Sequence, residues 1–188
     1  MQTKSTPSLS ASRPQPAPPL QGMLLLRLLA VALACAGIRG VGIILVDERG
    51  RFLVNLRAQH AVEPDDKAQR PARAFLSRRW AILAGAIERG EAPQETALRE
   101  VREETGHAVT RIHPVVRVSW PRTVHLYGAG LTVPLEELHL GEGMEHRLVT
   151  LDEVPALHPR APLLRAVLRA FAGTPAYRAS LRDAGKTQ

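Results

Sequence analysis

Residues 85–106 carry three glutamates within five positions, flanked by glycines and a proline at positions that suit a helix. The stretch reads GAIERGEAPQETALREVREETG, from Gly85 to Gly106. Pro93 is suited to the first turn of a helix, and a glycine after the last turn can adopt the left-handed conformation that ends it. The pattern predicts a helix from about Pro93 to Thr105.

The predicted helix carries its glutamates on one side. At about 100° per residue, Glu100, Glu103 and Glu104 share a face. Carboxylates this close repel one another unless a cation neutralises them, and Mg²⁺ or Mn²⁺ prefers such oxygen ligands. The spacing therefore indicates a divalent-metal site for a phosphorylated substrate. A solvated face with ion pairs such as Arg99 to Glu103 is the alternative. The neighbouring face, which can pack on a sheet, consists of Gln94, Leu98, Val101 and Thr105.

The same stretch resembles the signature of the Nudix hydrolases: Gly, five residues, Glu, seven residues, Arg-Glu, an aliphatic, any residue, Glu-Glu, any residue, Gly, then an aliphatic. His107 stands where the final aliphatic is usual. A solvated face has no reason to supply Gly85 and Glu91 at these offsets, so they favour the site. The matching positions are Gly85, Glu91, Arg99, Glu100, Val101, Glu103, Glu104 and Gly106.

The resemblance implies an α+β fold, with helices on both faces of a mixed central β-sheet in an α/β/α sandwich. It covers about residues 37–173, the expected Nudix hydrolase domain. Residues 1–36 are expected to be a disordered tail plus an apolar segment, and residues 174–188 a loose C-terminal tail. The implied activity is metal-dependent hydrolysis of a diphosphate bond in a nucleoside diphosphate linked to another moiety X. A non-catalytic nucleotide-binding sensor or interaction domain is the alternative, although such domains commonly lack signature acids.

Roles follow from the resemblance residue by residue. It implies Mg²⁺ or Mn²⁺ on Glu100, Glu103 and Glu104, with the backbone carbonyl of Ala84 as a further ligand. The catalytic residues would be Glu100, Glu103 and Arg99. Either of these glutamates could deprotonate the attacking water, and Arg99 would orient Glu91 and the acidic face. The structural positions would be Gly85, Glu91 and Gly106, and candidates for an additional metal ligand are Glu145 and Glu142.

Ala84 departs from the family, which has Pro-Gly-Gly where this chain has Leu83-Ala84-Gly85. An alanine at positive φ would cost about 1 kcal/mol relative to glycine. Apolar runs predict strands at residues 41–46, 51–56, 109–120 and 124–133, one strand containing Trp80, and another ahead of the Asp152-Glu153 pair. In the predicted strands, Pro114, Gly128 and Gly130 mark a bulge or an edge. A loop is predicted at residues 58–75, and a one-sided helix at residues 162–171.

Charge and composition limit the classes of binding partner that we expect. The chain of 188 residues carries a net charge of +7, which attracts polyanions. Aromatic residues make up only 4% of it, and no basic run is interleaved with them, so a nucleotide or related diphosphate is expected as partner rather than nucleic acid. Cys35 is the only cysteine, so no disulfide can form within the chain, and the seven histidines lack the spacing of metal ligands.

Residues 23–36 form an apolar run interrupted by Arg27, too short and too charged for a transmembrane helix. They resemble the hydrophobic region of a signal peptide, with Ala34-Cys35-Ala36 as the cleavage site. The long polar segment before the run and the lack of disulfide usage favour the cytoplasm. Export or membrane tethering of the hydrolase is one alternative. A translation start at Met23 and a helix packed on the domain are others.

Overall fold

The computed structural model describes residues 24, 27, 40–57, 79–119, 123–139, 143–159, 161 and 163–186. Apart from Leu24 and Arg27, the predictions for residues 1–36 lie outside this part of the chain, as do those for the loop at residues 58–75, Trp120 and Glu142. Within the described ranges, no helix is both long enough and apolar enough to cross a bilayer.

The described strands form one mixed sheet of seven strands. Its order is β3-β2-β1-β6-β5, with β4 paired to β1 and β7 paired to β2. β1 and β6 run parallel, whereas the other pairs are antiparallel. The strands are β1 (Gly40–Val46), β2 (Phe52–Arg57), β3 (Trp80–Ala81), β4 (Leu83–Gly85), β5 (His113–Val118), β6 (Val124–Gly130) and β7 (Gly143–Val149).

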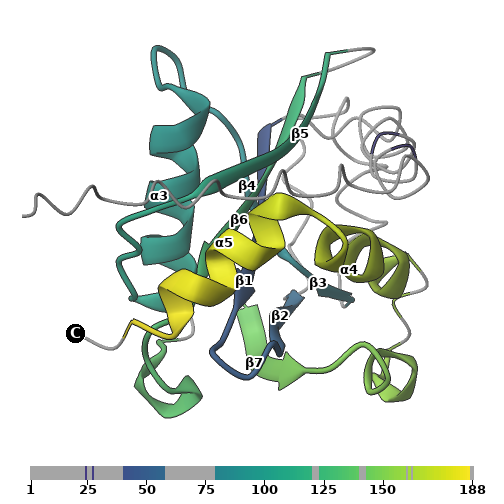
Figure 1. Cartoon of the computed structure of the whole chain (residues 1–188). Helices are drawn as coiled ribbons and strands as arrows, with labels where there is room; N and C mark the ends of the chain where they lie inside the picture. The colour runs from purple at the N-terminus through teal and green to yellow at the C-terminus, as the bar shows by residue number, and fades with distance from the viewer. Residues whose placement is uncertain are drawn as a thin grey trace, which may run out of the picture.

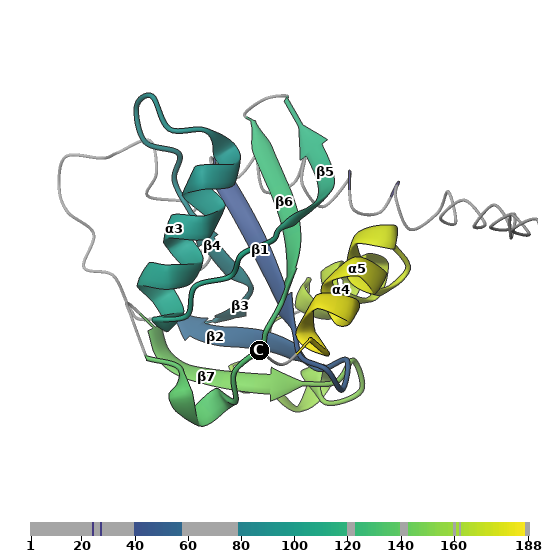
Figure 2. The same ribbon diagram turned by 60° about the vertical axis from the view of Figure 1, so that its left-hand side comes forward.

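Helices cover both faces of this sheet. Figure 2 shows α3 (Pro93–Thr105) on one side, and α4 (Leu164–Ala172) and α5 (Pro175–Ala184) together on the other (Figure 1). Two short 3₁₀ turns, η1 (Leu135–Glu137) and η2 (Val154–Ala156), flank β7 in the chain. The predicted α+β sandwich with a mixed central sheet is confirmed.

The core lies on both faces of β1, and every residue of this strand is buried. Side chains of a strand alternate between faces. Ile43 therefore joins the apolar cluster that contains Val101 of α3, and Ile44 joins the cluster that contains Leu168 and Phe171 of α4. A strand buried on both sides needs a continuous apolar run, which is the pattern this segment has.

Helix α3 has the boundaries that its end signals predict. Pro93 occupies the first turn, and Gly106 ends the helix with φ of 69° and ψ of −7°, in the left-handed region. Glu95 accepts a hydrogen bond of 2.9 Å from the backbone N–H of Ala92, as a capping box does. The ends of this helix are therefore fixed by local contacts.

Residues 175–184 form a helix, within the segment that polar composition predicted to be a loose tail. Helix α5 buries its small residues Ala176, Ser180 and Ala184 at intervals of four, so its charged residues lie elsewhere on its surface. Thr174 caps it by accepting a hydrogen bond of 3.1 Å from the N–H of Tyr177. The prediction weighed average polarity and missed the spacing of the small residues.

Gly128 and Gly130 allow α5 to approach β6 closely, and both pair in register with β1. A Cβ at Gly128 would lie 2.9 Å from Oγ of Ser180, and one at Gly130 would lie 2.5 Å from the backbone nitrogen of Ala184. The expected irregularity near these glycines is therefore wrong for β6. The one near Pro114 is confirmed, because the register of β5, an edge strand, shifts between Pro114 and Val116.

Candidate active site

Arg99 of α3 joins the carboxylates of the signature. Its Nε donates to Oε1 of Glu91 at 2.9 Å, and its Nη1 donates to Oε1 of Glu100 and to Oε2 of Glu103, each at 2.8 Å. Nη2 donates to the carbonyl of Ala86 at 3.1 Å. One planar guanidinium thus ties the loop before the helix to two carboxylates on the helix. Arg99 thus contacts Glu91, Glu100 and Glu103, the groups that it was predicted to orient.

The charges of this cluster stabilise one another. The hydrogen bonds from Arg99, and then from the hydroxyl of Thr96, lower the pKa of Glu91 to about 2. In return, the hydrogen bond to Glu91 raises the pKa of Arg99 above its usual value, with smaller contributions from Glu103 and Glu100. Both groups are therefore charged throughout the physiological range. The positive charge of Arg99 offsets part of the repulsion between the signature carboxylates.

Glu104 lies apart from this cluster and is buried, with 8% of its surface exposed. Its Oε2 accepts a hydrogen bond of 2.7 Å from Nδ2 of Asn55 in β2, and its Oε1 a longer one of 3.4 Å from the N–H of Ala84. The side chain of Glu103, by contrast, is 57% exposed. The three glutamates thus share a helical turn but meet different surroundings.

The buried face of α3 is rotated from the predicted one. Val101 and Thr105 are buried as expected, but Gln94 is exposed and Leu98 is half-buried. Ala97, which lies between Gln94 and Leu98 in sequence, faces the sheet instead. The full set of buried residues is Thr96, Ala97, Val101, Glu104 and Thr105. This rotation brings Glu104 to the sheet, where Asn55 and Ala84 can reach it.

Strand β4 lies against the acidic side of α3. A Cβ at Gly85 would lie 1.8 Å from Cδ of Glu100, so only glycine leaves room for that carboxylate. Ala84 pairs with Gly42 of β1 as an ordinary strand residue. Extended backbone is open to any L-residue. The penalty considered for an alanine at positive φ therefore does not arise.

Strand β7 contributes one residue that the sequence did not single out. The predicted candidate Glu145 forms an ion pair with Arg147. The next residue, His146, lies opposite Asn55, and its Nε2 is 3.1 Å from the carbonyl oxygen of Glu104 and 3.3 Å from that of His139. His146 is one of the seven histidines whose spacing did not indicate a metal site. Asn55 had a visible signal, because it is the one polar residue within the apolar run of residues 52–56.

The donors in this region fit a hard divalent cation. They are oxygens: the carboxylates of Glu100, Glu103 and Glu104, and Oδ1 of Asn55, which is buried without a hydrogen-bond partner among the described residues. In the part of the chain that the structure describes, no three metal-binding side chains converge on one point. Two of the carboxylates contact Arg99, and the third contacts Asn55.

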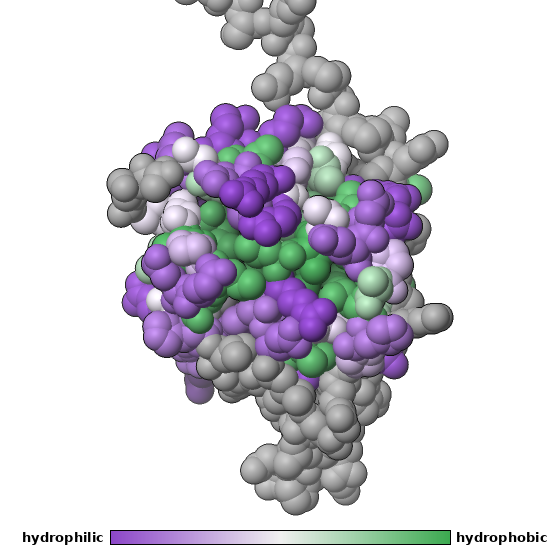
Figure 3. All heavy atoms as spheres, turned by 90° about the horizontal axis from the view of Figure 1, so that it is seen from below, coloured by the Kyte–Doolittle hydropathy of each residue, from purple (hydrophilic) through white to green (hydrophobic). Residues whose placement is uncertain are grey.

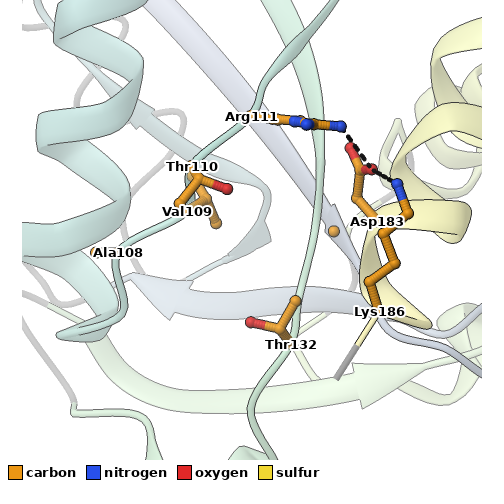
Figure 4. Close-up of a pocket in the computed structure, with 8 residues that line it drawn as sticks. Ala108, Val109, Thr110, Arg111, Thr132, Asp183 and Lys186 are labelled. Atoms are coloured by element: carbon orange, nitrogen blue, oxygen red, sulfur yellow. Dashed lines mark hydrogen bonds and ion pairs between the residues drawn. The ribbon is translucent and has the colours of Figure 1, made fainter. Parts of the chain in front are cut away.

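A separate pocket of about 220 Å³ opens between the segment after α3, the end of β6 and the end of α5. Figure 4 shows its two cations, Arg111 and Lys186, directed toward Asp183, at 3.9 Å and 3.4 Å. Burial raises the pKa of Asp183, but the hydrogen bonds from His113 and Lys186 outweigh this, and the net shift is downward. Both cations thus have an acidic partner already, which reduces their pull on a phosphate.

The surface at one end of the molecule is apolar at its centre. Figure 3, which views the molecule from below Figure 1, shows apolar side chains gathered there within a border of polar ones. In Figure 1, β7 and the C-terminal end of α3 lie toward this lower side.

Comparison with known proteins agrees with the fold. A model of the NUDIX domain matches residues 38–171. The MutT protein of Methanosarcina mazei Go1 is similar with a TM-score of 0.50 and 19% identity, over 70% of this chain and 89% of that one. A MutT structure from an analysis of the Aliivibrio salmonicida and Vibrio cholerae proteins gives 0.52 and 17%, over 73% and 98%.

A third similar structure is the NUDIX domain of Shewanella oneidensis NrtR, in complex with ADP ribose. It has a TM-score of 0.52 and 15% identity, over 71% of this chain and 86% of that one. Structural likeness at such low identity supports the fold, while the match over residues 38–171 and the signature residues around Arg99 support the family. The chain therefore belongs to the Nudix family of pyrophosphohydrolases.

Proposed function

We propose that this protein hydrolyses a diphosphate bond in a nucleoside diphosphate linked to another moiety, with Mg²⁺ or Mn²⁺ held by Glu100, Glu103 and Glu104. The observation that carries the proposal is that Arg99 holds the signature carboxylates Glu91, Glu100 and Glu103, while Gly85 leaves room for Glu100. A domain that only bound nucleotides would have no need to keep every one of these acids in this arrangement.

The chemistry follows from charge. A diphosphate resists hydrolysis because its anionic oxygens repel a nucleophile. A divalent cation held by Glu100, Glu103 and Glu104 would neutralise these oxygens and make the attacking water more acidic. Water attacks phosphorus, the bridging P–O bond breaks, and Glu100 or Glu103 accepts the proton of the water. Arg99 keeps both glutamates in place through hydrogen bonds of 2.8 Å.

The remaining signature residues support this chemistry. The carbonyl of Ala84 is proposed as a further ligand, because the N–H of the same residue lies beside Glu104. Gly85 gives Glu100 its space, Glu91 anchors Arg99, and Gly106 ends the helix. Glu145 is proposed as an additional ligand only if it leaves its ion pair with Arg147. We propose the cytoplasm as the site of action, with export as the alternative.

The test is hydrolysis by the purified full chain with Mg²⁺, measured as release of phosphate or of nucleoside monophosphate. The panel contains ADP-ribose, which the Shewanella oneidensis domain binds, together with nucleoside triphosphates, dinucleoside polyphosphates and nucleotide sugars. We expect turnover of at least one compound, its loss in excess EDTA, and its recovery when Mg²⁺ is restored. Full turnover in EDTA would overturn the metal assignment. Tight binding of a nucleotide without turnover would favour a sensor.

A further inference from the structure

We propose that Asn55 is a positioning residue of the acidic site, which fixes the carboxylate of Glu104 and thereby raises the affinity of the protein for a divalent cation. The inference rests on the proposed function of Glu104 as a metal ligand. Asn55 lies in β2, outside the signature and 49 residues from Glu104 in sequence.

The contact between the two side chains is short and buried. Nδ2 of Asn55 donates to Oε2 of Glu104 at 2.7 Å, and the two residues are 3% and 8% exposed. The opposite amide orientation would place the carbonyl oxygen of Asn55 against the carboxylate, so that two acceptors would face each other. The orientation of the amide is therefore determined by Glu104.

A neutral donor suits a metal ligand in this position. A buried carboxylate needs hydrogen-bond donors. Arg99 supplies donors and a positive charge to Glu100 and Glu103, whereas the amide of Asn55 supplies a donor without a charge. The contact with Asn55 thus orients Glu104 without adding a positive charge of its own beside the carboxylate.

His146 supports the same residue from the adjacent strand. It lies opposite Asn55 in the pairing of β2 with β7, and its Nε2 contacts the main-chain oxygens of Glu104 and His139. Both of these partners are acceptors, so Nε2 carries the hydrogen. Asn55 fixes the side chain of Glu104, and His146 fixes its main chain. The two strands together hold Glu104 at two points.

The unpaired oxygen of Asn55 argues against a role in packing alone. Oδ1 is buried without a hydrogen-bond partner among the described residues. A buried acceptor without a donor is costly, and an apolar side chain such as those of Leu53 and Val54 would avoid the cost. The presence of asparagine here is explained if its amide nitrogen is needed to hold the carboxylate of Glu104 by a hydrogen bond.

The test measures the affinity of the full chain for Mn²⁺ by electron paramagnetic resonance. The dependence of turnover on metal concentration is measured in parallel. Asn55→Leu keeps the approximate size of the side chain and removes the donor. We expect it to weaken Mn²⁺ binding by about 10–100-fold, the range for residues that orient metal ligands. Val54 lies in the same strand but belongs to the core cluster that contains Leu168 and Phe171 of α4. Val54→Ala should therefore lose stability without this loss of Mn²⁺ affinity. Asn55→Ser, too short to keep the 2.7 Å contact, serves if the leucine variant fails to fold.

A second arm asks whether Asn55 acts through Glu104. In a Glu104→Gln background, Asn55→Leu or Asn55→Ser should cause little further loss of Mn²⁺ affinity. If the wild type binds Mn²⁺ and Glu104→Gln weakens the binding, but the Asn55 variants bind like the wild type, the inference is overturned and the proposed function stands. If the wild type does not bind Mn²⁺, or if Glu104→Gln has no effect, the metal site itself is wrong.

Discussion

The side chain of Glu100 fills the space that a Cβ at residue 85 would occupy. Cδ and Oε1 of Glu100 lie 1.8 and 1.9 Å from the ideal position of that Cβ. Gly85 lies in β4, so the requirement for glycine at this position is one of space. Because residue 85 of the strand has no side chain, the carboxylate of Glu100 on the signature helix can lie directly against the strand.

Gly85→Ala should displace the carboxylate of Glu100 while the fold survives, because the clashing atoms belong to the end of a side chain that can rotate. A displacement of about 1 Å can lower a rate by about 100-fold, and we expect a loss of kcat of that order. Steady-state kinetics and thermal unfolding measure the two effects. Gly185→Ala, whose added Cβ would find nothing nearer than 3.8 Å, is the control and should retain activity. Equal kcat in both variants would contradict the assignment.

Two glutamates on α3 should respond differently to neutralisation. Glu103→Gln keeps the helix but removes a ligand charge, so kcat should fall by about 100-fold or more. Glu95→Gln, at the first turn, should cost up to about 1 kcal/mol of stability and little activity, because Glu95 only caps the helix. Parallel kinetic and denaturation measurements test the pair. Equal losses of activity would show that the acidic face is not a site.

The ion pair of Glu91 with Arg99 predicts a contribution to stability that acid removes. The pKa of Glu91 is lowered from 4.5 to about 2 in the folded protein, so its contribution is present above pH 4.5 and is lost as the pH falls toward 2. In Glu91→Gln, the free energy of unfolding should fall less steeply across this window than in the wild type. Urea denaturation at several pH values provides the comparison, and identical slopes would refute the prediction.

Gly130→Ala should destabilise the fold more than Gly42→Ala. A Cβ at Gly130 would meet backbone atoms of α5 at 2.5 and 2.7 Å, whereas one at Gly42 would meet the ends of two side chains at 3.1 and 3.2 Å. Backbone yields less readily than a side-chain end, and overpacking of this kind costs about 1–3 kcal/mol. Chemical denaturation of both variants measures the difference. A smaller loss for Gly130→Ala would mean that α5 can shift at little cost.

The features that sequence predicts best here are the local ones. Pro93 and Gly106 lie within a few residues of the helix ends that they define, so the boundaries of α3 could be read directly. The contacts of Arg99 with Glu100 and Glu103 likewise lie within one or two turns of a helix. The signature encodes this part of the site in one continuous segment.

The features that sequence missed depend on contacts between distant segments. The burial of Glu104 requires Asn55, which is 49 residues away. The role of His146 becomes visible only once β7 is paired with β2. The rotation of α3 toward Ala97 is set by the strands beneath it rather than by its own periodicity. The sequence can mark a residue such as Asn55 as unusual, but it does not show which distant residue it will contact.

Helix α5 packs closely against β6, although it lies outside the segment that the family model matches. The family match ends at residue 171, before α5 begins at Pro175. Ser180 and Ala184 nevertheless supply atoms within 3 Å of the Cβ positions that Gly128 and Gly130 leave empty. A protein cut at the limit of the match would keep its whole signature and nearly all of α4, and yet expose to water the part of β6 that α5 covers.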